Sequence, residues 1–278
     1  MLAAIRSAAV LGIDAYDVTV EVDVAPGLPQ WIIVGLPASA VKESRERVGA
    51  ALVNAGFTVP PRRVTVNLAP ADVKKEGTAF DLPIALGLLV GTGVLDPVRV
   101  ESCVIVGELG LDGSVRPVRG ALSIARRVAA SDDRAPRTLV LPEANVAEAA
   151  LVHGLRLSAP ATLAQVADWL RRGVLPAPTR RPAVAGAEDT LDIADVAGQE
   201  GAKRALTIAA AGAHGILLIG PPGAGKTMLA RRLPTILPAL TNAEALEVTA
   251  VHSVAGMLDA TTGVVSHRPF RAPHHSIS

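Results

Sequence analysis

The sequence predicts an α/β protein of two domains, and three observations carry this prediction. Strand-like and helix-like apolar patterns follow one another from residue 18 to residue 172. Residues 173–190 contain three prolines and no apolar period, which is typical of a linker. From Leu191 an apolar run, a glycine-rich loop and a helical pattern come in direct succession. We therefore expect a first domain at 1–172, a linker at 173–190 and the start of a second domain at 191–278.

The first domain is expected to be of the α+β type. Residues 18–24 alternate apolar and polar side chains, which predicts a half-buried strand. Further strands are predicted at 31–37, 62–70, 138–143 and 155–162, and two strands around the Asp112-Gly113 turn at 103–118. Helices are predicted at 39–55 with Gly56 as the cap, at 82–90, from Ala121, from Asn145, and up to Arg172.

The second domain is expected to begin with a helix at 198–215 that ends at a glycine. Residues 216–220, which read ILLIG, predict a buried strand because the run is short, apolar and followed by a glycine-rich turn. A helix is predicted at 226–237 directly after that turn.

Composition limits the classes of protein. Half of the residues are apolar but only 2% are aromatic, so both cores must be mainly aliphatic. The net charge of +1 gives no overall attraction to nucleic acid or membrane, and any such contact must be local. Cys103 is the only cysteine, which favours a reducing, cytoplasmic location. The longest apolar stretch, 82–95, is too short to span a bilayer and is interpreted as a buried helix, so we expect a soluble protein without membrane contact.

The glycine-rich loop matches the pattern G-x-x-x-x-G-K-[ST]. Glycines let backbone N–H groups approach phosphate oxygens, a lysine reaches the outer phosphates, and a threonine hydroxyl binds Mg²⁺. The alternative is a strand-to-helix turn without a ligand. The loop predicts a site for ATP and Mg²⁺ made of Gly220, Pro221, Pro222, Gly223, Ala224, Gly225, Lys226 and Thr227, with Thr227 as the metal ligand.

Nucleotide hydrolysis also needs an acidic residue that holds Mg²⁺ and orients water. After Thr227 the acids are Glu244, Glu247 and Asp259, and none follows a buried apolar run. The set of catalytic residues is therefore expected to be incomplete. We expect that this chain alone binds ATP but does not hydrolyse it efficiently.

Several longer segments resemble the ComM/YifB group of magnesium-chelatase-like ATPases. They are residues 7–37, 43–48, 60–72, 74–87, 192–206 and 251–278. The resemblance implies a ribosomal-S5/Lon-like first domain joined to the first part of a P-loop AAA+ α/β domain. It also implies a hexamer that moves branched or single-stranded DNA, by branch migration, during DNA uptake and recombination. The acid, sensor and arginine finger of the family are expected beyond Ser278. By the same resemblance, Ile193 and Val196 are candidates for the adenine pocket, with a plain core position as the alternative.

The Lon resemblance raises a serine–lysine protease as a rival. The segment 74–87, where Lon has its nucleophile, contains Thr78 but no serine, and Ser123 stands about where the lysine is expected. No lysine occurs from Glu76 to Ala202. Because a hydroxyl nucleophile needs an adjacent base, the first domain is interpreted as protease-dead.

A basic segment near the end of the chain contains Arg268, Arg271, His274 and His275. A contact with DNA phosphates and a structural or subunit contact are both open for these residues, and metal binding by the histidine pair is a third alternative. Arg62-Arg63 and Lys74-Lys75 form either a second basic patch or ordinary solvated charge.

Three function classes follow: ATP-driven work on DNA, a chelatase-type ATPase that remodels a protein or metal-insertion complex, and a nucleotide-binding module without turnover. Stimulation of ATP hydrolysis by DNA separates the first two, and nucleotide binding tests the third.

Overall fold

The computed structural model describes residues 1–131, 138–173, 191–258 and 263–273, and its fold is of the predicted α/β class. The described residues fall into two compact units. The first unit contains those of 1–184 and 250–263, and the second contains those of 185–249 and 264–278. Helix α9 (Asn242–Ala255) contributes its first part to the second unit and its last part to the first.

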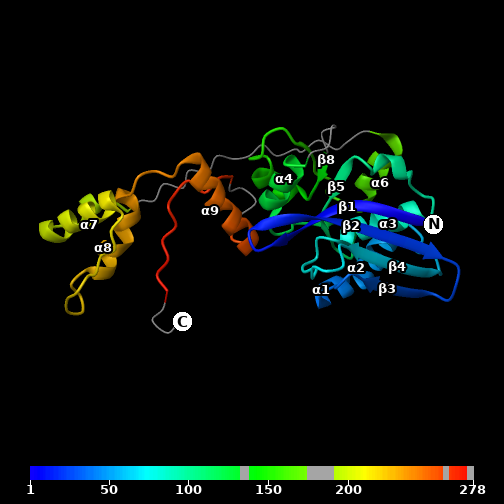
Figure 1. The fold of residues 1–278 in the computed structure, drawn as a ribbon, viewed down its shortest axis with the longest axis horizontal. Coiled ribbons are helices and arrows are strands. Elements are labelled where there is room, and N and C mark those ends of the chain that lie inside the picture. The colour runs from blue at the N-terminus through cyan, green and yellow to red at the C-terminus, as the bar shows by residue number, and fades with distance from the viewer. Residues whose placement is uncertain (132–137, 174–190, 259–262, 274–278) are drawn as a thin grey trace. The chain divides into compact units, whose positions relative to one another are not determined.

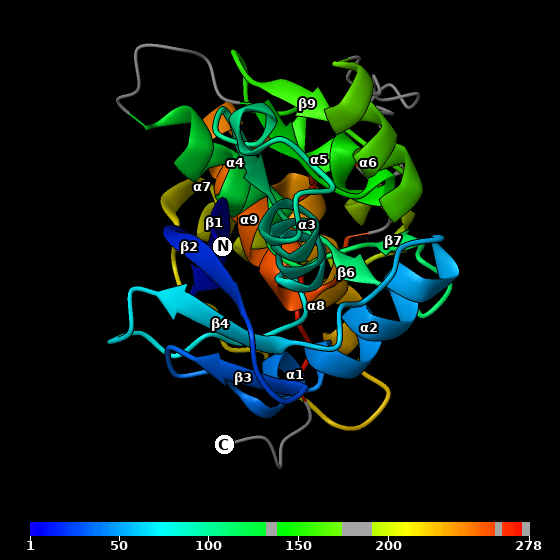
Figure 2. The same cartoon turned by 90° about the vertical axis from the view of Figure 1, so that its right-hand side faces the viewer.

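The first unit is organised around a four-stranded sheet in the order β1-β2-β4-β3 (Figure 1). The strands are β1 (Leu2–Leu11), β2 (Asp14–Ala25), β3 (Gln30–Val34) and β4 (Arg63–Ala69). β2 pairs antiparallel with β1 and β4, whereas β3, at one edge of the sheet, runs parallel to β4 (Figure 2). Strands β2, β3 and β4 confirm the predictions, but β1 was not predicted. Its ten residues are a strand because all of them pair with β2.

Three helices follow in this part of the chain: α1 (Ser39–Lys42), α2 (Ser44–Asn54) and α3 (Asp81–Gly91). The predicted helix at 39–55 is therefore interrupted at Glu43, and Gly56 adopts the expected left-handed conformation with φ of +83°. Every residue of α3 is buried, as predicted. A Cβ atom on Gly87 would lie 2.5 Å from Cγ2 of Val22, so only glycine allows α3 to approach β2 this closely.

An ion pair joins α2 to the first turn of α3. The guanidinium of Arg47 donates from Nε to Oδ2 of Asp81 at 2.6 Å and from NH2 to Oδ1 at 3.0 Å. The Asp81 side chain is 1% exposed, and the backbone N–H of Leu109 donates to it as well. Burial raises the pKa of Asp81, and the hydrogen bonds from Arg47 oppose this rise.

The remainder of the first unit contains a three-stranded parallel sheet and a short hairpin. The strands are β5 (Cys103–Ile105), β6 (Glu108–Leu109), β7 (Val115–Arg116), β8 (Thr138–Val140) and β9 (Arg156–Ser158). The prediction of two strands at 103–118 was wrong in one respect. Only β6 and β7 pair across the Asp112-Gly113 turn, while β5 joins the parallel sheet β5-β8-β9, because its buried residues match the equally buried β8.

Helices pack beside these strands. They are η1 (Pro97–Arg99), α4 (Ala121–Ala129), η2 (Glu143–Asn145), α5 (Val146–Ala149) and α6 (Leu163–Arg172), where η marks a 3-10 helix. The helix predicted from Asn145 is thus only one turn long. Cys103 is 1% exposed at the start of β5, and burial raises the pKa of its thiol.

The second unit is helical among its described residues. Its elements are η3 (Ile193–Asp195), α7 (Glu200–Gly212), α8 (Lys226–Arg232), η4 (Leu233–Ile236) and the first part of α9. The predicted helix at 226–237 is confirmed, with its last turn tightened into η4 at Pro234. Within the described parts of the chain, no helix has both the length and the apolar character needed to cross a membrane.

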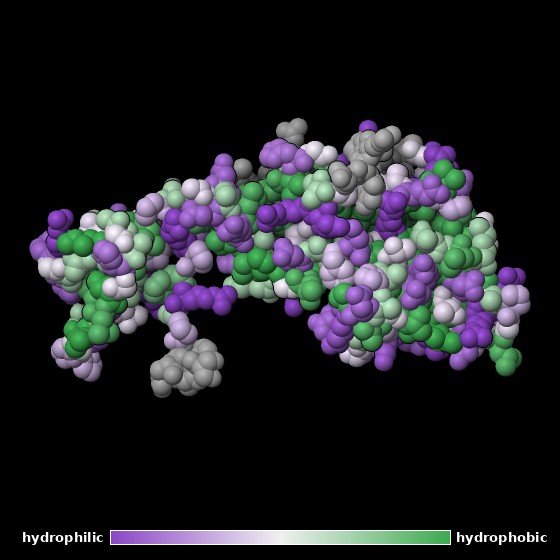
Figure 3. All heavy atoms as spheres, viewed as in Figure 1, coloured by the Kyte–Doolittle hydropathy of each residue, from purple (hydrophilic) through white to green (hydrophobic). Residues whose placement is uncertain are grey.

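The prediction of a buried strand at 216–220 was wrong. These residues have no regular structure, and Leu217 and Ile219 are 80% and 86% exposed. A strand requires a partner for its backbone groups, and none of residues 191–258 and 263–273 is in a strand. Hydrophobic residues are visible on the surface of the second unit (Figure 3).

Candidate nucleotide-binding site

The glycine-rich loop connects residues 216–220 to helix α8. Gly223 and Gly225 have φ of +81° and +80°, a region that side chains with a Cβ atom rarely adopt. Gly225 is the cap of α8, and Lys226 and Thr227 are its first two residues. The two glycines therefore turn the chain so that the loop ends directly on a helix N-terminus.

Backbone donors of this loop are available to a ligand. The backbone N–H groups of Gly223, Gly225, Lys226 and Thr227 donate no hydrogen bond to any described residue. The ammonium group of Lys226 donates to the carbonyl oxygens of Gly220 and Pro221 at 2.8 and 2.7 Å, so it already lies against the loop. A positive side chain beside free N–H groups at a helix N-terminus is the donor set that suits phosphate oxygens.

A small apolar cluster packs against the helix that follows the loop. Val196, Leu206 and Leu229 are its buried members, and Ile193 packs against them. Leu229 belongs to α8, so the cluster holds the helix that begins at the loop. Ile193 and Val196, the two candidates for the adenine pocket, are thus members of this core.

Two contacts near the loop were missed in the sequence analysis. Gln199 adopts a left-handed conformation with φ of 55° and its side-chain Nε2 donates to the carbonyl of Ala224 at 3.4 Å. Arg232, on α8, donates from Nε to the carbonyl of Asp192 at 2.8 Å. Both contacts join residues that are 25 or 40 positions apart, so no local sequence pattern could have indicated them.

The acidic residues after Thr227 are engaged elsewhere or exposed. Glu244 accepts from the backbone N–H of Thr241 at 2.8 Å and pairs with Arg268 at 3.3 Å, and its hydrogen bonds with Thr241 lower its pKa. Glu247 is exposed, and Asp259 lies outside the described residues. Neither Glu244 nor Glu247 lies at a strand end, the placement that a Mg²⁺-holding acid requires.

The basic segment is described only as far as residue 273. Arg268 donates from Nε to the carbonyl of Pro238 at 2.7 Å in addition to its pairing with Glu244, so its guanidinium is used within its own unit. Arg271 is exposed. His274 and His275 lie outside the described residues.

The positions that correspond to the Lon catalytic pair do not form a hydroxyl–lysine pair. The hydroxyl of Thr78 donates to the carboxylate of Glu108. Ser123 is buried and donates to the carbonyl of Ile13 at 2.6 Å. Lys75 is fully buried, donates to the carbonyl of Val73 and has its pKa lowered by burial, and it contacts neither hydroxyl.

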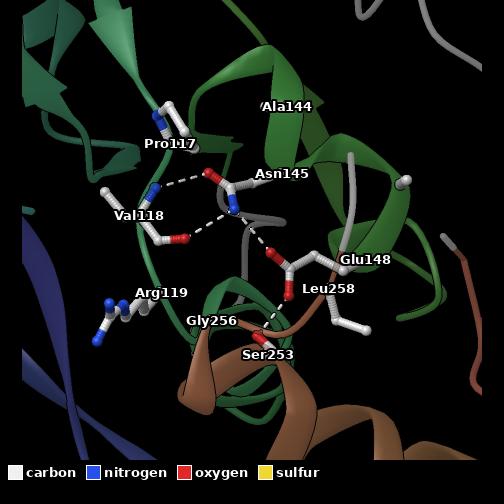
Figure 4. A pocket seen from close by; sticks show the side chains of 10 residues that line it. Pro117, Val118, Arg119, Ala144, Asn145, Glu148, Ser253, Gly256 and Leu258 are labelled. Atoms are coloured by element: carbon white, nitrogen blue, oxygen red, sulfur yellow. Dashed lines mark hydrogen bonds between the residues drawn. The ribbon is translucent and has the colours of Figure 1, made fainter. Parts of the chain in front are cut away.

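A cavity of about 290 Å³ in the first unit is lined by a buried carboxylate, that of Glu148 (Figure 4). Glu148 accepts hydrogen bonds from Asn145 Nδ2 at 2.7 Å, from the backbone N–H of Leu122 at 3.3 Å, and from the hydroxyl of Ser253. Ser253 lies on the part of α9 that belongs to the first unit. The carboxylate therefore connects three segments that are distant in sequence.

We expect Glu148 to make the stability of the first unit depend on pH. Burial is the main cause that raises its pKa above the ordinary value of 4.5. A raised folded-state pKa means that its contribution is complete below the unfolded-state pKa and is lost as pH rises through the folded-state pKa. Between pH ~4 and pH ~8 the free energy of unfolding of the wild-type chain should therefore fall relative to that of Glu148→Gln. The expected fall is roughly 1.4 kcal/mol for each unit by which the pKa is raised.

Chemical denaturation of both proteins across this pH range measures the difference between their free energies of unfolding. The other titrating groups are the same in both proteins, so their contributions cancel in this difference. Parallel stability profiles, or a wild-type chain that gains relative to Glu148→Gln as pH rises, would contradict the prediction.

Comparison with known proteins assigns the family. A family model described as subunit ChlI of Mg-chelatase matches residues 20–145, and one described as magnesium chelatase, subunit ChlI, matches residues 192–278. The competence protein ComM of Haemophilus influenzae is 43% identical over 282 residues, and the YifB protein of Salmonella typhimurium is 44% identical over 278 residues. An uncharacterised protein of Mycobacterium tuberculosis is 46% identical over 272 residues.

These alignments cover 98–100% of this chain but only 54% of each relative, so the chain spans about half the length of the curated relatives it matches. The chain belongs to the magnesium-chelatase-like family, in the group that includes ComM and YifB. It is therefore a member of a ChlI-type family related to AAA+ ATPases, and the loop at 220–227 lies inside the second matched segment.

Proposed function

We propose that this chain contains the nucleotide-binding site of an AAA+ ATPase, with ATP and Mg²⁺ bound at residues Gly220–Thr227. The observation that carries the proposal is the set of free backbone N–H groups at the start of α8, beside the ammonium of Lys226. Such a set matches the negative charge and the acceptor oxygens of a triphosphate.

The residues present divide the work of binding among them. The N–H groups of Gly223, Gly225 and Lys226 surround the inner phosphates, and the ammonium of Lys226 exchanges its carbonyl partners for outer phosphate oxygens. The hydroxyl of Thr227 would be a ligand of Mg²⁺, and the bound ion would neutralise phosphate charge. Arg232 and the apolar cluster around Leu229 keep α8 in place during this exchange.

We expect Lys226→Ala to weaken ATP·Mg²⁺ binding about 10- to 100-fold, because a hydrogen bond to a charged group contributes ~1.5–3 kcal/mol. Isothermal titration calorimetry on the 278-residue chain measures this. Arg231→Ala is the matched control, since it removes one exposed positive charge from the same helix without touching the loop. Equal affinities for wild type and Lys226→Ala would exclude the site.

For the full-length protein we propose ATP-driven work on DNA as a homo-hexamer, with branched or single-stranded DNA as the substrate and branch migration as the outcome. The similarity to a protein named competence protein ComM supports this choice. The second candidate is a chelatase-type ATPase that remodels a protein or metal-insertion complex, and it is favoured by the two matching family models, which both describe a subunit of magnesium chelatase. ATP hydrolysis that rises on addition of DNA supports the first candidate, and hydrolysis indifferent to DNA supports the second.

A further inference from the structure

A groove of about 420 Å³ lies on the first unit, between the edge strand β3, the helix α2 and the segment before β4. It is lined by Pro29, Gln30, Trp31, Arg45, Glu46, Gly49, Ala50, Val59, Pro60, Pro61 and Arg62. None of these residues belongs to the phosphate loop or to the cavity around Glu148.

The floor of this groove is aromatic. Trp31 and Val59 are half-buried and pack against the main core of the unit while also lining the groove. The chain has only two tryptophans, and the other, Trp169, is 7% exposed. In a protein with 2% aromatic residues, one of its two indole rings thus faces a solvent-open groove.

The rim carries positive charge on two sides. Arg62 is exposed, and its guanidinium has no partner among the residues that the structure describes. Arg45 on α2, which also lines the groove, pairs with Glu46 at 3.3 Å and with no other described residue, and both side chains are exposed. Exposed pairs of this kind are weak, so a phosphate can replace Glu46 as the partner of Arg45.

The wall that holds Arg62 is stiff. Pro60 and Pro61 have fixed φ angles, and the backbone N–H of Arg62 donates to the carbonyl of Pro60 at 2.8 Å. The arginine therefore starts from a restrained backbone, which lowers the entropy lost when it binds a ligand.

We propose that this groove binds single-stranded nucleic acid, with one base stacked on Trp31 and the neighbouring phosphates held by Arg45 and Arg62. The combination of an aromatic surface and flanking cations is how proteins bind single strands without reading sequence. The proposal rests on the proposed DNA-related function and adds a contact point outside the nucleotide-binding unit. A proline-rich peptide fits less well, because it offers no negative charge to the two guanidinium groups.

The adjacent arginine provides a matched control. In the register of β3 and β4, Gln30 lies opposite Arg63 and Trp31 lies opposite Val64. Val64 is buried on the helix-covered face of the sheet, and successive strand residues point to opposite faces. Arg63 is therefore on the other face, exposed and absent from the groove lining, although it has the same charge as Arg62.

Gly49 allows the groove to be filled without removing any charge. It lies inside α2, and a Cβ atom added there meets no heavy atom within 4 Å. Methionine at this position extends into open space and has a higher helix propensity than glycine. Gly49→Met is therefore expected to fold normally while it blocks access to Trp31.

The test uses the 278-residue chain, an oligothymidine of about 20 nucleotides and fluorescence anisotropy at low salt, together with quenching of tryptophan emission. We expect binding that quenches the emission and is about tenfold weaker for Gly49→Met and for Trp31→Leu. Arg62→Ser should weaken binding and reduce the slope of log affinity against log salt by about one, whereas Arg63→Ser changes affinity less than about twofold.

Three results would overturn the proposal: unchanged affinity in Gly49→Met, equal losses in Arg62→Ser and Arg63→Ser, or binding of a proline-rich peptide in place of the oligonucleotide. Hydrolysis of ATP by a full-length relative, with and without DNA, tests the proposed function separately. If DNA stimulates hydrolysis but the groove variants bind the oligonucleotide as the wild type does, the groove proposal is rejected and the proposed function stands. If binding depends on the groove but DNA does not stimulate hydrolysis, the proposed ATP-driven work on DNA is rejected and the groove proposal stands.

Discussion

The 278-residue chain is expected to hydrolyse ATP no faster than its Lys226→Ala variant, whereas a chain extended to the length of its relatives gains turnover that branched or single-stranded DNA stimulates. The reason is that phosphate binding and hydrolysis need different residues. An arginine finger alone contributes a factor of roughly 10³–10⁵ to turnover, and an acid near Mg²⁺ is required as well. Glu244 is occupied by Thr241 and Arg268, and Glu247 is an exposed helix residue.

Steady-state phosphate release by the two chains, each with its Lys226→Ala control, measures the difference. We also expect the shorter chain to show no hexamer in analytical ultracentrifugation in the presence of ATP, since in an AAA+ ring the finger comes from a neighbouring subunit. Robust Lys226-dependent turnover by the shorter chain would falsify this prediction, and would mean that Glu244, Glu247 or Asp259 acts as the acid.

Arg47→Ala should destabilise the first unit by about 3–5 kcal/mol, because it leaves the buried carboxylate of Asp81 without its charged partner. The Asp81 side chain is 1% exposed, and without Arg47 the hydrogen bond from the N–H of Leu109, at 3.3 Å, is the only one that described residues donate to its carboxylate. Urea denaturation followed by circular dichroism measures the loss.

Two variants separate this explanation from a general effect of losing an arginine. Arg45→Ala, two residues earlier on the same helix, removes an exposed pair and should change stability by less than about 1 kcal/mol. The double variant Arg47→Met/Asp81→Leu should be more stable than Arg47→Ala, because it removes the unpaired charge together with its partner. A loss in Arg47→Ala no larger than that in Arg45→Ala contradicts the prediction.

The glycine-rich loop and the start of the helix after it could be predicted from sequence because the residues that form them are contiguous. Gly223 and Gly225 have the left-handed conformations that their residue type permits, and Lys226 begins the predicted helix. The supporting contacts of Gln199 and Arg232 could not be predicted, since each depends on how distant turns pack.

The buried strand at 216–220 was predicted from the same local pattern and is absent. Apolar character and length describe what a segment prefers, but a strand forms only where another strand accepts its backbone hydrogen bonds. The opposite error occurred at residues 2–11, where a modest apolar pattern becomes β1 because β2 pairs with every residue of it.

The sequence by itself determined the α/β class, the position of the glycine-rich loop before a helix and the wholly buried helix α3, because each follows from residue types within a few positions of one another. Only the tertiary structure decided which strands pair, that Arg47 neutralises Asp81, and that Glu148 accepts from Ser253. It also decided that Trp31, Gly49 and Arg62 share one groove. The physical reason is that pairing, burial of charge and the shape of a surface depend on contacts between segments far apart in the chain, and local preferences carry no information about them.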